Sequence, residues 1–145
     1  MRLLGHPIHP AVVHFPLALL GTSLAFDLAG LFTEREAFWS IAFWNIALGL
    51  VIAPVTALAG LVDSLQVKRG HPASRTLTLH LSAMLGAVSC YAIALVVRRG
   101  PGVPVGSVLW GTLALEVAGL GLLLFGGWLG GELVYRYGVG RVEPG

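Results

Sequence analysis

Four long apolar runs separated by short polar breaks are the feature that most constrains the fold of this chain. The runs cover residues 11–31, 38–62, 76–97 and 105–135. Each is long enough to cross the hydrocarbon core of a bilayer, which takes about 20 apolar residues in a helix. In lipid only helices and closed barrels satisfy every backbone hydrogen bond, and these continuous runs lack the alternation of barrel strands. The sequence therefore predicts four transmembrane helices.

The breaks between the runs predict how the helices are arranged. They cover residues 33–36, 68–72 and 98–104, and the last contains prolines that cannot continue a helix. Short connections make consecutive helices antiparallel neighbours. Only 11% of the residues are charged, against about a quarter in soluble domains. We therefore expect an all-α transmembrane four-helix bundle, a single integral membrane domain over residues 1–145, with the lipid bilayer as its surroundings.

Lysine and arginine predict the orientation in the membrane. One face carries Arg2, Lys68, Arg69, Arg75, Arg136 and Arg141, and the other carries Arg35, Arg98 and Arg99. The positive-inside rule then places both termini in the cytoplasm.

The net charge of +2 is too small and too confined to loops for a nucleic-acid partner. The first run contains His14 and Pro16 and is long for a signal peptide, so we expect a retained helix.

The two halves of the chain resemble each other weakly. Gly5-His6-Pro7 precedes His14, and Gly70-His71-Pro72 precedes His80. Each half then supplies an apolar helix, a connection and a second helix. Parallel repeats in membrane proteins are related by an axis along the membrane normal. One interpretation is two similar helical hairpins related by a pseudo-two-fold axis of this kind, and the other is a chance match of short motifs.

All five histidines are expected at one end of the bundle. His14 and His80 lie about one turn inside the same membrane face, at nearly equal depth. Imidazole is costly in lipid, so a cluster of histidines there favours binding or proton transfer. The other candidate ligands at this face are His6, His9, His71, Asp63 and Glu132.

Three interpretations of this end remain open. Histidines on facing helices at matching depth are typical of haem in a bundle, so His14 and His80 are candidate ligands of haem b in membrane electron transfer. Zinc, copper or iron bound directly is the second interpretation, because these metals take nitrogen and carboxylate ligands. Its candidate ligands are His6, His9, His14, His71, His80, Asp63 and Glu132. The third interpretation is a structural subunit with interfacial histidines and no cofactor.

For the other polar and aromatic residues, the sequence predicts only their immediate surroundings. Asp27 lies near the far end of the first helix, and Glu116 lies near the middle of the fourth. A carboxyl group at such depth is neutral, paired or functional, and for Glu116 the options are a bond to Thr112 or a proton path. Aromatic residues near helix ends are expected to form an interfacial belt: Trp39, Trp44, Trp110, Trp128, Tyr135 and Tyr137.

Enzyme motifs of the common kinds are missing from the sequence. It has no GxSxG motif, no P-loop and no HExxH motif, which argues against a hydrolase or transferase. The single cysteine, Cys90, excludes an intrachain disulfide and a CxxC site. An electron-transfer or binding protein is therefore a better interpretation than a stand-alone enzyme.

Both ends of the chain resemble one family. Residues 5–10 (GHPIHP) with residues 13–16 (VHFP), and residues 130–135 (GGELVY) with residues 138–140 (GVG), are similar to the DUF2231 family. The resemblance covers essentially the whole chain and implies a small four-helix protein of the bacterial inner membrane. Some members are fused to Rieske-type domains, which implies an electron-transfer context. This chain has no Rieske ligand set, so its partner would be a separate redox protein or a quinone. Exposed glycine-rich faces make a homodimer plausible.

Overall fold

A computed structural model describes residues 2–3, 6–7, 12–65, 67 and 70–139 of the chain. Within strands β1 and β2 (residues 2–3 and 6–7), and at Asp63, the description covers the backbone and not the side chains. Strand β1 (Arg2–Leu3) pairs antiparallel with β2 (His6–Pro7) in a minimal two-stranded ribbon.

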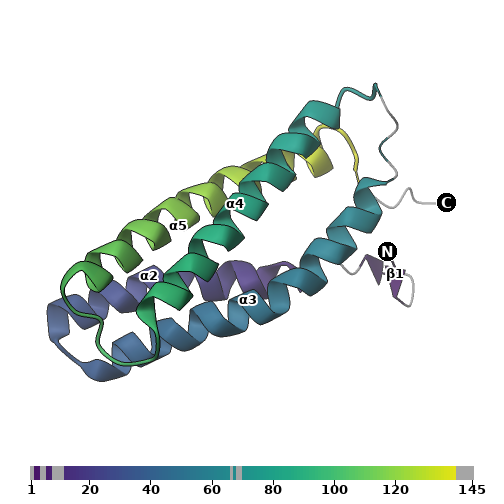
Figure 1. The fold of residues 1–145 in the computed structure, drawn as a ribbon. Coiled ribbons are helices and arrows are strands. Elements are labelled where there is room, and N and C mark those ends of the chain that lie inside the picture. The colour runs from purple at the N-terminus through teal and green to yellow at the C-terminus, as the bar shows by residue number, and fades with distance from the viewer. Residues whose placement is uncertain (1, 4–5, 8–11, 66, 68–69, 140–145) are drawn as a thin grey trace.

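Four long helices make up the rest of the described fold (Figure 1). They are α2 (His14–Thr33), α3 (Glu36–Ser64), α4 (Ser74–Arg98) and α5 (Gly106–Tyr135). Each is long and apolar enough to cross a membrane. The expected all-α transmembrane bundle is confirmed. The helix ends differ from the expected bounds by a few residues, as is usual where terminal turns fray.

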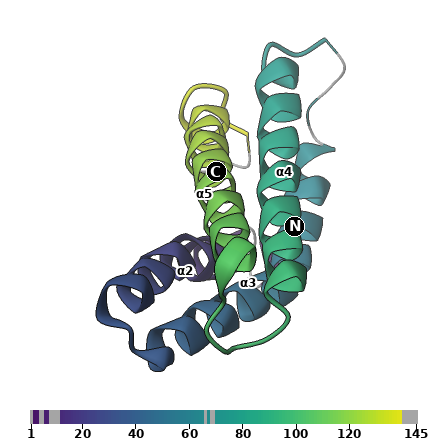
Figure 2. The ribbon, with the colours of Figure 1, turned by 60° about the vertical axis from the view of Figure 1, so that its left-hand side comes forward.

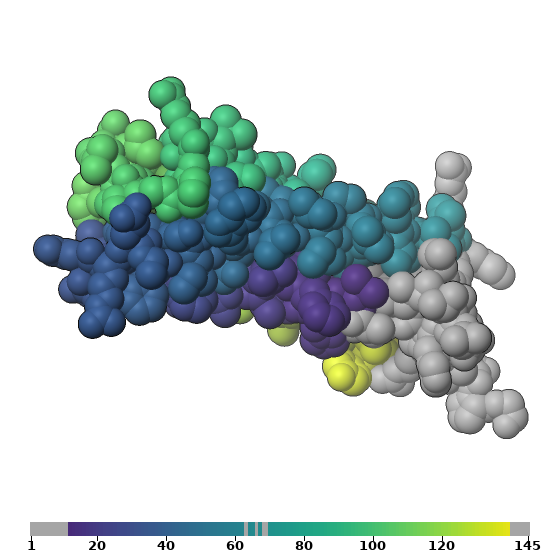
Figure 3. All heavy atoms as spheres, turned by 90° about the horizontal axis from the view of Figure 1, so that it is seen from below, coloured from purple at the N-terminus to yellow at the C-terminus, as the bar shows by residue number. Residues whose placement is uncertain are grey.

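The helices pack as two hairpins. Helix α2 packs mainly against α3, and α4 packs mainly against α5. Figures 1 and 2 show that the α2–α3 and α4–α5 connections lie at the same end, here named the connection end. Helices α2 and α4 begin at the opposite end, here named the histidine end because His14, His71 and His80 lie toward it. Figure 3 shows one long face of the molecule, formed mainly by α2 and α3.

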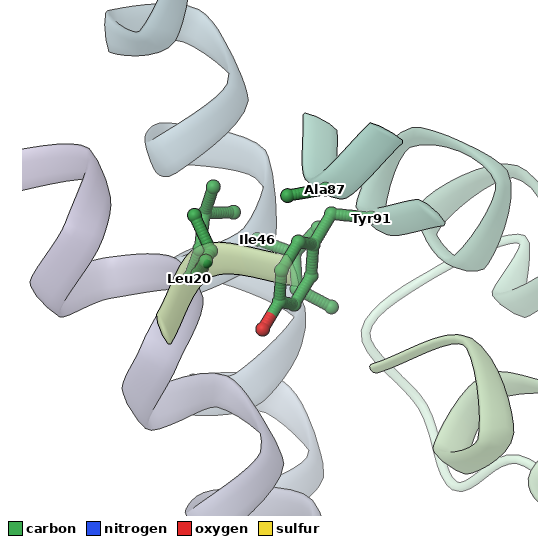
Figure 4. Packing of buried hydrophobic residues seen from close by; sticks show 5 residues of the cluster. Leu20, Ile46, Ala87 and Tyr91 are labelled. Atoms are coloured by element: carbon green, nitrogen blue, oxygen red, sulfur yellow. The ribbon is translucent and has the colours of Figure 1, made fainter. Parts of the chain in front are cut away.

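A small apolar layer joins the hairpins between the two ends. Its buried members are Leu20 on α2, Ile46 on α3, Ala87 and Tyr91 on α4, and Leu123 on α5 (Figure 4). Large apolar side chains elsewhere are mostly exposed, including Val51 at 73% and Val96 at 75%. An exposed apolar exterior around a thin core is what helices in contact with lipid require, because lipid tails are as apolar as these side chains.

Glycine makes the close packing in this layer possible. A Cβ atom at Gly119 would lie 2.7 Å from Cε2 of Tyr91, and one at Gly49 would lie 2.8 Å from Cγ of Leu20. Real side chains do not approach so closely, so Tyr91 and Leu20 occupy space that only glycine leaves open. These contacts bring α4 against α5 and α2 against α3 at the level of the apolar layer.

Candidate functional site

His80 lies against α5 at the histidine end. Its Nδ1 is 2.8 Å from the backbone carbonyl oxygen of Gly126. The ring also approaches Gly130 closely, since a Cβ atom there would lie 3.2 Å from Cε1 of His80. A carbonyl oxygen only accepts hydrogen bonds, so Nδ1 is the donor and Nε2 is the acceptor nitrogen of the neutral ring. Metal-ligating histidines typically have this arrangement, with one ring nitrogen oriented by a carbonyl group.

His71 has the opposite arrangement. Its Nδ1 accepts a hydrogen bond from the backbone N–H of Ala73 at 3.1 Å, and its ring lies edge-on to Tyr137 with centroids 6.4 Å apart. In a neutral ring the proton is therefore on Nε2. The bond stabilises the turn that leads into α4, which gives His71 a local structural role.

The structure places the other predicted ligands separately. His14 is the exposed first residue of α2, and its predicted position facing His80 stays a prediction. Glu132 accepts a hydrogen bond at 2.8 Å from Arg136, and this bond raises the pKa of the exposed Arg136 guanidinium. His9 and the side chains of His6 and Asp63 lie outside the described residues.

A metal site of several protein ligands was the second interpretation of this end. Within the described part of the chain, no group of three or more His, Cys, Asp or Glu residues could hold a metal ion. The direct-metal interpretation therefore depends on side chains that the structure does not describe.

A second group of polar side chains lies toward the connection end. We name it the buried polar cluster, and its members are Ser23, Asp27, Tyr91, Arg98, Thr112 and Glu116. All six are buried, although the helices that carry them are otherwise apolar. Polar groups in such surroundings are costly and are usually functional.

Arg98 and Asp27 form the centre of this cluster. Arg98 Nη1 donates a hydrogen bond to Asp27 Oδ2 at 2.6 Å, and both side chains are inaccessible to solvent. Arg98 Nη2 donates to the backbone carbonyl of Trp39, and its guanidinium lies 5.8 Å from the centre of the Trp39 ring. The ion pair thus joins α4 to α2, and the second bond joins α4 to α3.

Gly30 makes room for this arrangement. A Cβ atom at Gly30 would lie 2.6 Å from Cε2 of Trp39. Trp39 can therefore fold inward over α2, where it is only 3% exposed. This overturns the expectation that Trp39 belongs to an interfacial belt. Trp44, Trp110, Trp128 and Tyr135 are exposed, and their place in such a belt stays a prediction.

Glu116 completes the cluster from α5. Its carboxyl group interacts with the Asp27 carboxyl group, with the Arg98 guanidinium group and with the Ser23 side chain. Neither carboxyl oxygen makes a hydrogen bond of good geometry. Of the two options for Glu116, the bond to Thr112 is wrong, because Thr112 Oγ1 is also without a hydrogen-bond partner. The buried carboxyl group therefore faces the polar side chains of Asp27 and Arg98 on other helices and not a partner on its own helix.

Comparison with known proteins identifies the family. Residues 5–143 match the DUF2231 family, which is described as predicted membrane proteins. The chain belongs to the DUF2231 family. No curated protein and no solved structure matches this DUF2231 chain.

Sequence reasoning missed Arg98 as a member of the DUF2231 chain's buried cluster. The sequence predicts that Arg98 lies in a polar loop, because Arg99-Gly100-Pro101 follows it. It is the last residue of α4, and its side chain turns back into the bundle. A usable signal was present: Asp27 lies toward the same end of the bundle, and an intramembrane carboxylate needs a cation or a proton.

Proposed function

We propose that this DUF2231 protein binds haem b at the histidine end, where His80 and His14 would hold it, and carries electrons in the membrane. The observation that supports this most is the bond between His80 Nδ1 and the Gly126 carbonyl oxygen. It orients the ring and fixes its tautomer so that Nε2 is the acceptor nitrogen, which is the state that a histidine needs in order to bind iron.

The chain's own residues orient the ligand. Gly126 supplies the carbonyl oxygen, and Gly130 leaves space for the ring beside the helix. Haem b, when bound, would supply a one-electron carrier. A membrane quinone or a separate redox protein would exchange electrons with it.

The proposal places the protein in a bacterial inner membrane with both termini in the cytoplasm. The sequence assigns Arg98 to the outer face together with Arg35 and Arg99, but the Arg98 side chain is buried against Asp27. The outer face is left with Arg35 and Arg99, and this supports the orientation through the positive-inside rule. Open glycines on α5 support pairing with a second copy, because nothing lies within 4 Å of a Cβ atom at Gly111, Gly121 or Gly127.

An optical spectrum of the full chain, purified in detergent after expression with a haem supply, tests the proposal. We expect a Soret band with sharp reduced α and β bands, lost in His80→Ala and His14→Ala. His71→Ala is the matched control and should keep the spectrum, because His71 stabilises a turn.

Two results would overturn the haem proposal. A featureless spectrum with stoichiometric zinc, copper or iron by elemental analysis would favour a direct metal site. A featureless spectrum without metal would favour a structural subunit.

A further inference from the structure

We propose that the buried polar cluster is a proton-binding site, in which Glu116 takes up and releases a proton that reaches it from the connection end. This site lies apart from the histidine end and does not depend on a cofactor there. The ligand is a proton, and binding converts the Glu116 carboxylate to a carboxylic acid.

The charges of the cluster leave one carboxylate unbalanced. Among the described side chains that face Glu116, Asp27 comes from α2 and Arg98 and Tyr91 come from α4. Arg98 is the cation of this group and is bonded directly to Asp27 at 2.6 Å. Helix α3 contributes the neutral Trp39, whose backbone carbonyl oxygen accepts a hydrogen bond from Arg98. An ionised Glu116 would therefore add an uncompensated negative charge in surroundings of low polarity, and a bound proton removes it.

Cys90 adds one more titratable group near the cluster. It precedes Tyr91 on α4, is partly buried, and interacts electrostatically with the Tyr91 hydroxyl group. An ionised thiolate or phenolate would add negative charge beside Glu116. Neither group can replace the proton as the counter-charge for the Glu116 carboxylate.

Hydrogen-bonding capacity in the cluster is also unused. Six buried atoms have no hydrogen-bond partner: Asp27 Oδ1, Tyr91 OH, Arg98 Nε, Thr112 Oγ1, and Glu116 Oε1 and Oε2. Buried polar atoms are nearly always paired, so a concentration of unpaired ones marks a place where a ligand or proton is accommodated. A protonated Glu116 gains a donor, and Asp27 Oδ1 is an acceptor that lies in the same cluster.

The charged groups of the cluster lie at increasing distances from the connection end. Arg98 is the last residue of α4, and Asp27 precedes the end of α2 at Thr33 by six positions. Glu116 follows Gly106, the first residue of α5, by ten positions. At about 1.5 Å per residue, Glu116 lies about 15 Å along its helix. That is roughly half of a hydrocarbon core about 30 Å thick.

The buried polar cluster ends at the apolar layer. Continuing along α4 from Arg98 toward His80, the chain passes Tyr91 and then Ala87, which packs with Leu20 and Leu123 (Figure 4). The described side chains of this layer carry no titratable group beyond Tyr91. The arrangement favours a site loaded from the connection end and separated from the histidine end.

Infrared spectroscopy of the full chain reconstituted in lipid tests this site. We expect a protonated carboxylic acid C=O band at neutral pH that is lost in Glu116→Gln. The band should shift after transfer to D2O, because the proton exchanges through the connection end. Glutamine keeps the shape of the side chain without the charge. Glu132→Gln, which changes the exposed pair with Arg136, is the matched control and should leave the band in place.

Three results would overturn the proposal. A band that persists in Glu116→Gln would belong to another carboxyl group. A band that does not shift in D2O would mark a sealed structural acid without proton exchange. A carboxylate signal that appears when sodium replaces choline would assign the site to a metal cation. Circular dichroism of each variant shows that the helices remain, so a lost band reports the carboxyl group and not unfolding.

Discussion

Arg98 at the end of α4 donates a hydrogen bond of 2.6 Å from Nη1 to Oδ2 of Asp27 on α2, with both side chains closed to solvent. Residues 71 positions apart in the sequence are therefore joined inside the bundle. The bond connects one hairpin to the other, where the remaining contacts between the hairpins are few. A single polar contact thus helps to set how the two hairpins are placed.

Breaking this ion pair from one side should destabilise the protein strongly. Asp27→Leu would leave the Arg98 charge buried without its partner, and loss of one member of a buried pair typically costs about 3–5 kcal/mol. Reversible unfolding in detergent measures the change. The double variant Asp27→Leu, Arg98→Met should recover much of the loss, because it leaves no unpaired charge.

The exposed pair between Arg136 and Glu132 is the control for this prediction. It is also an arginine–carboxylate contact, at 2.8 Å, but it lies at the surface. Arg136→Gln should leave the unfolding transition unchanged. Equal losses from the buried and exposed variants would contradict the argument that burial makes the Asp27 contact important.

A methyl group at Gly119 should disturb the apolar layer. Gly119→Ala places a Cβ atom 2.7 Å from Cε2 of Tyr91, so the ring must move. Overpacking of this kind costs about 1–3 kcal/mol. The same unfolding measurement applies. Gly131→Ala on the same helix meets only Cδ2 of Tyr135, at an ordinary contact distance of 4.0 Å, and should be neutral or slightly stabilising, because alanine favours helix. Similar effects at both positions would refute the packing explanation.

His80 and His71 should hold opposite tautomers when neutral. The Gly126 carbonyl oxygen requires a proton on Nδ1 of His80, while the Ala73 N–H requires an unprotonated Nδ1 in His71. Nitrogen chemical shifts of selectively labelled histidine, measured by solid-state NMR without added haem, distinguish these states. Assignment by His71→Ala separates the two signals. Finding Nε2–H on His80 would remove the main support for its role as a ligand.

The orientation of the bundle should follow the exposed arginines. In a Cys90→Ser background, Gly102→Cys introduces a thiol at the connection end, and Pro72→Cys introduces one at the histidine end. We expect an impermeant maleimide added to intact cells to label the Gly102 variant and not the Pro72 variant. Labelling of Pro72→Cys alone would reverse the proposed topology. Permeabilised cells, in which both cysteines should react, provide the control.

The histidine end was only partly predictable from the sequence. The pattern of residues around His14 and His80 predicts that both lie toward one membrane face, and the helix starts agree. Sequence periodicity does not say which neighbour a side chain meets. The bond from His80 to Gly126, 46 positions away, depends on the close approach of α4 to α5.

The sequence by itself determined the number of helices, the approximate helix bounds and the membrane class. Lipid offers no hydrogen-bond partners, so continuous apolar runs of this length have few alternatives to helices. Only the tertiary structure decided that Arg98 lies inside and that Glu116 faces Asp27 instead of Thr112. Length and polarity act on each segment alone, whereas the partners of a buried charge depend on which helix faces meet across the bundle.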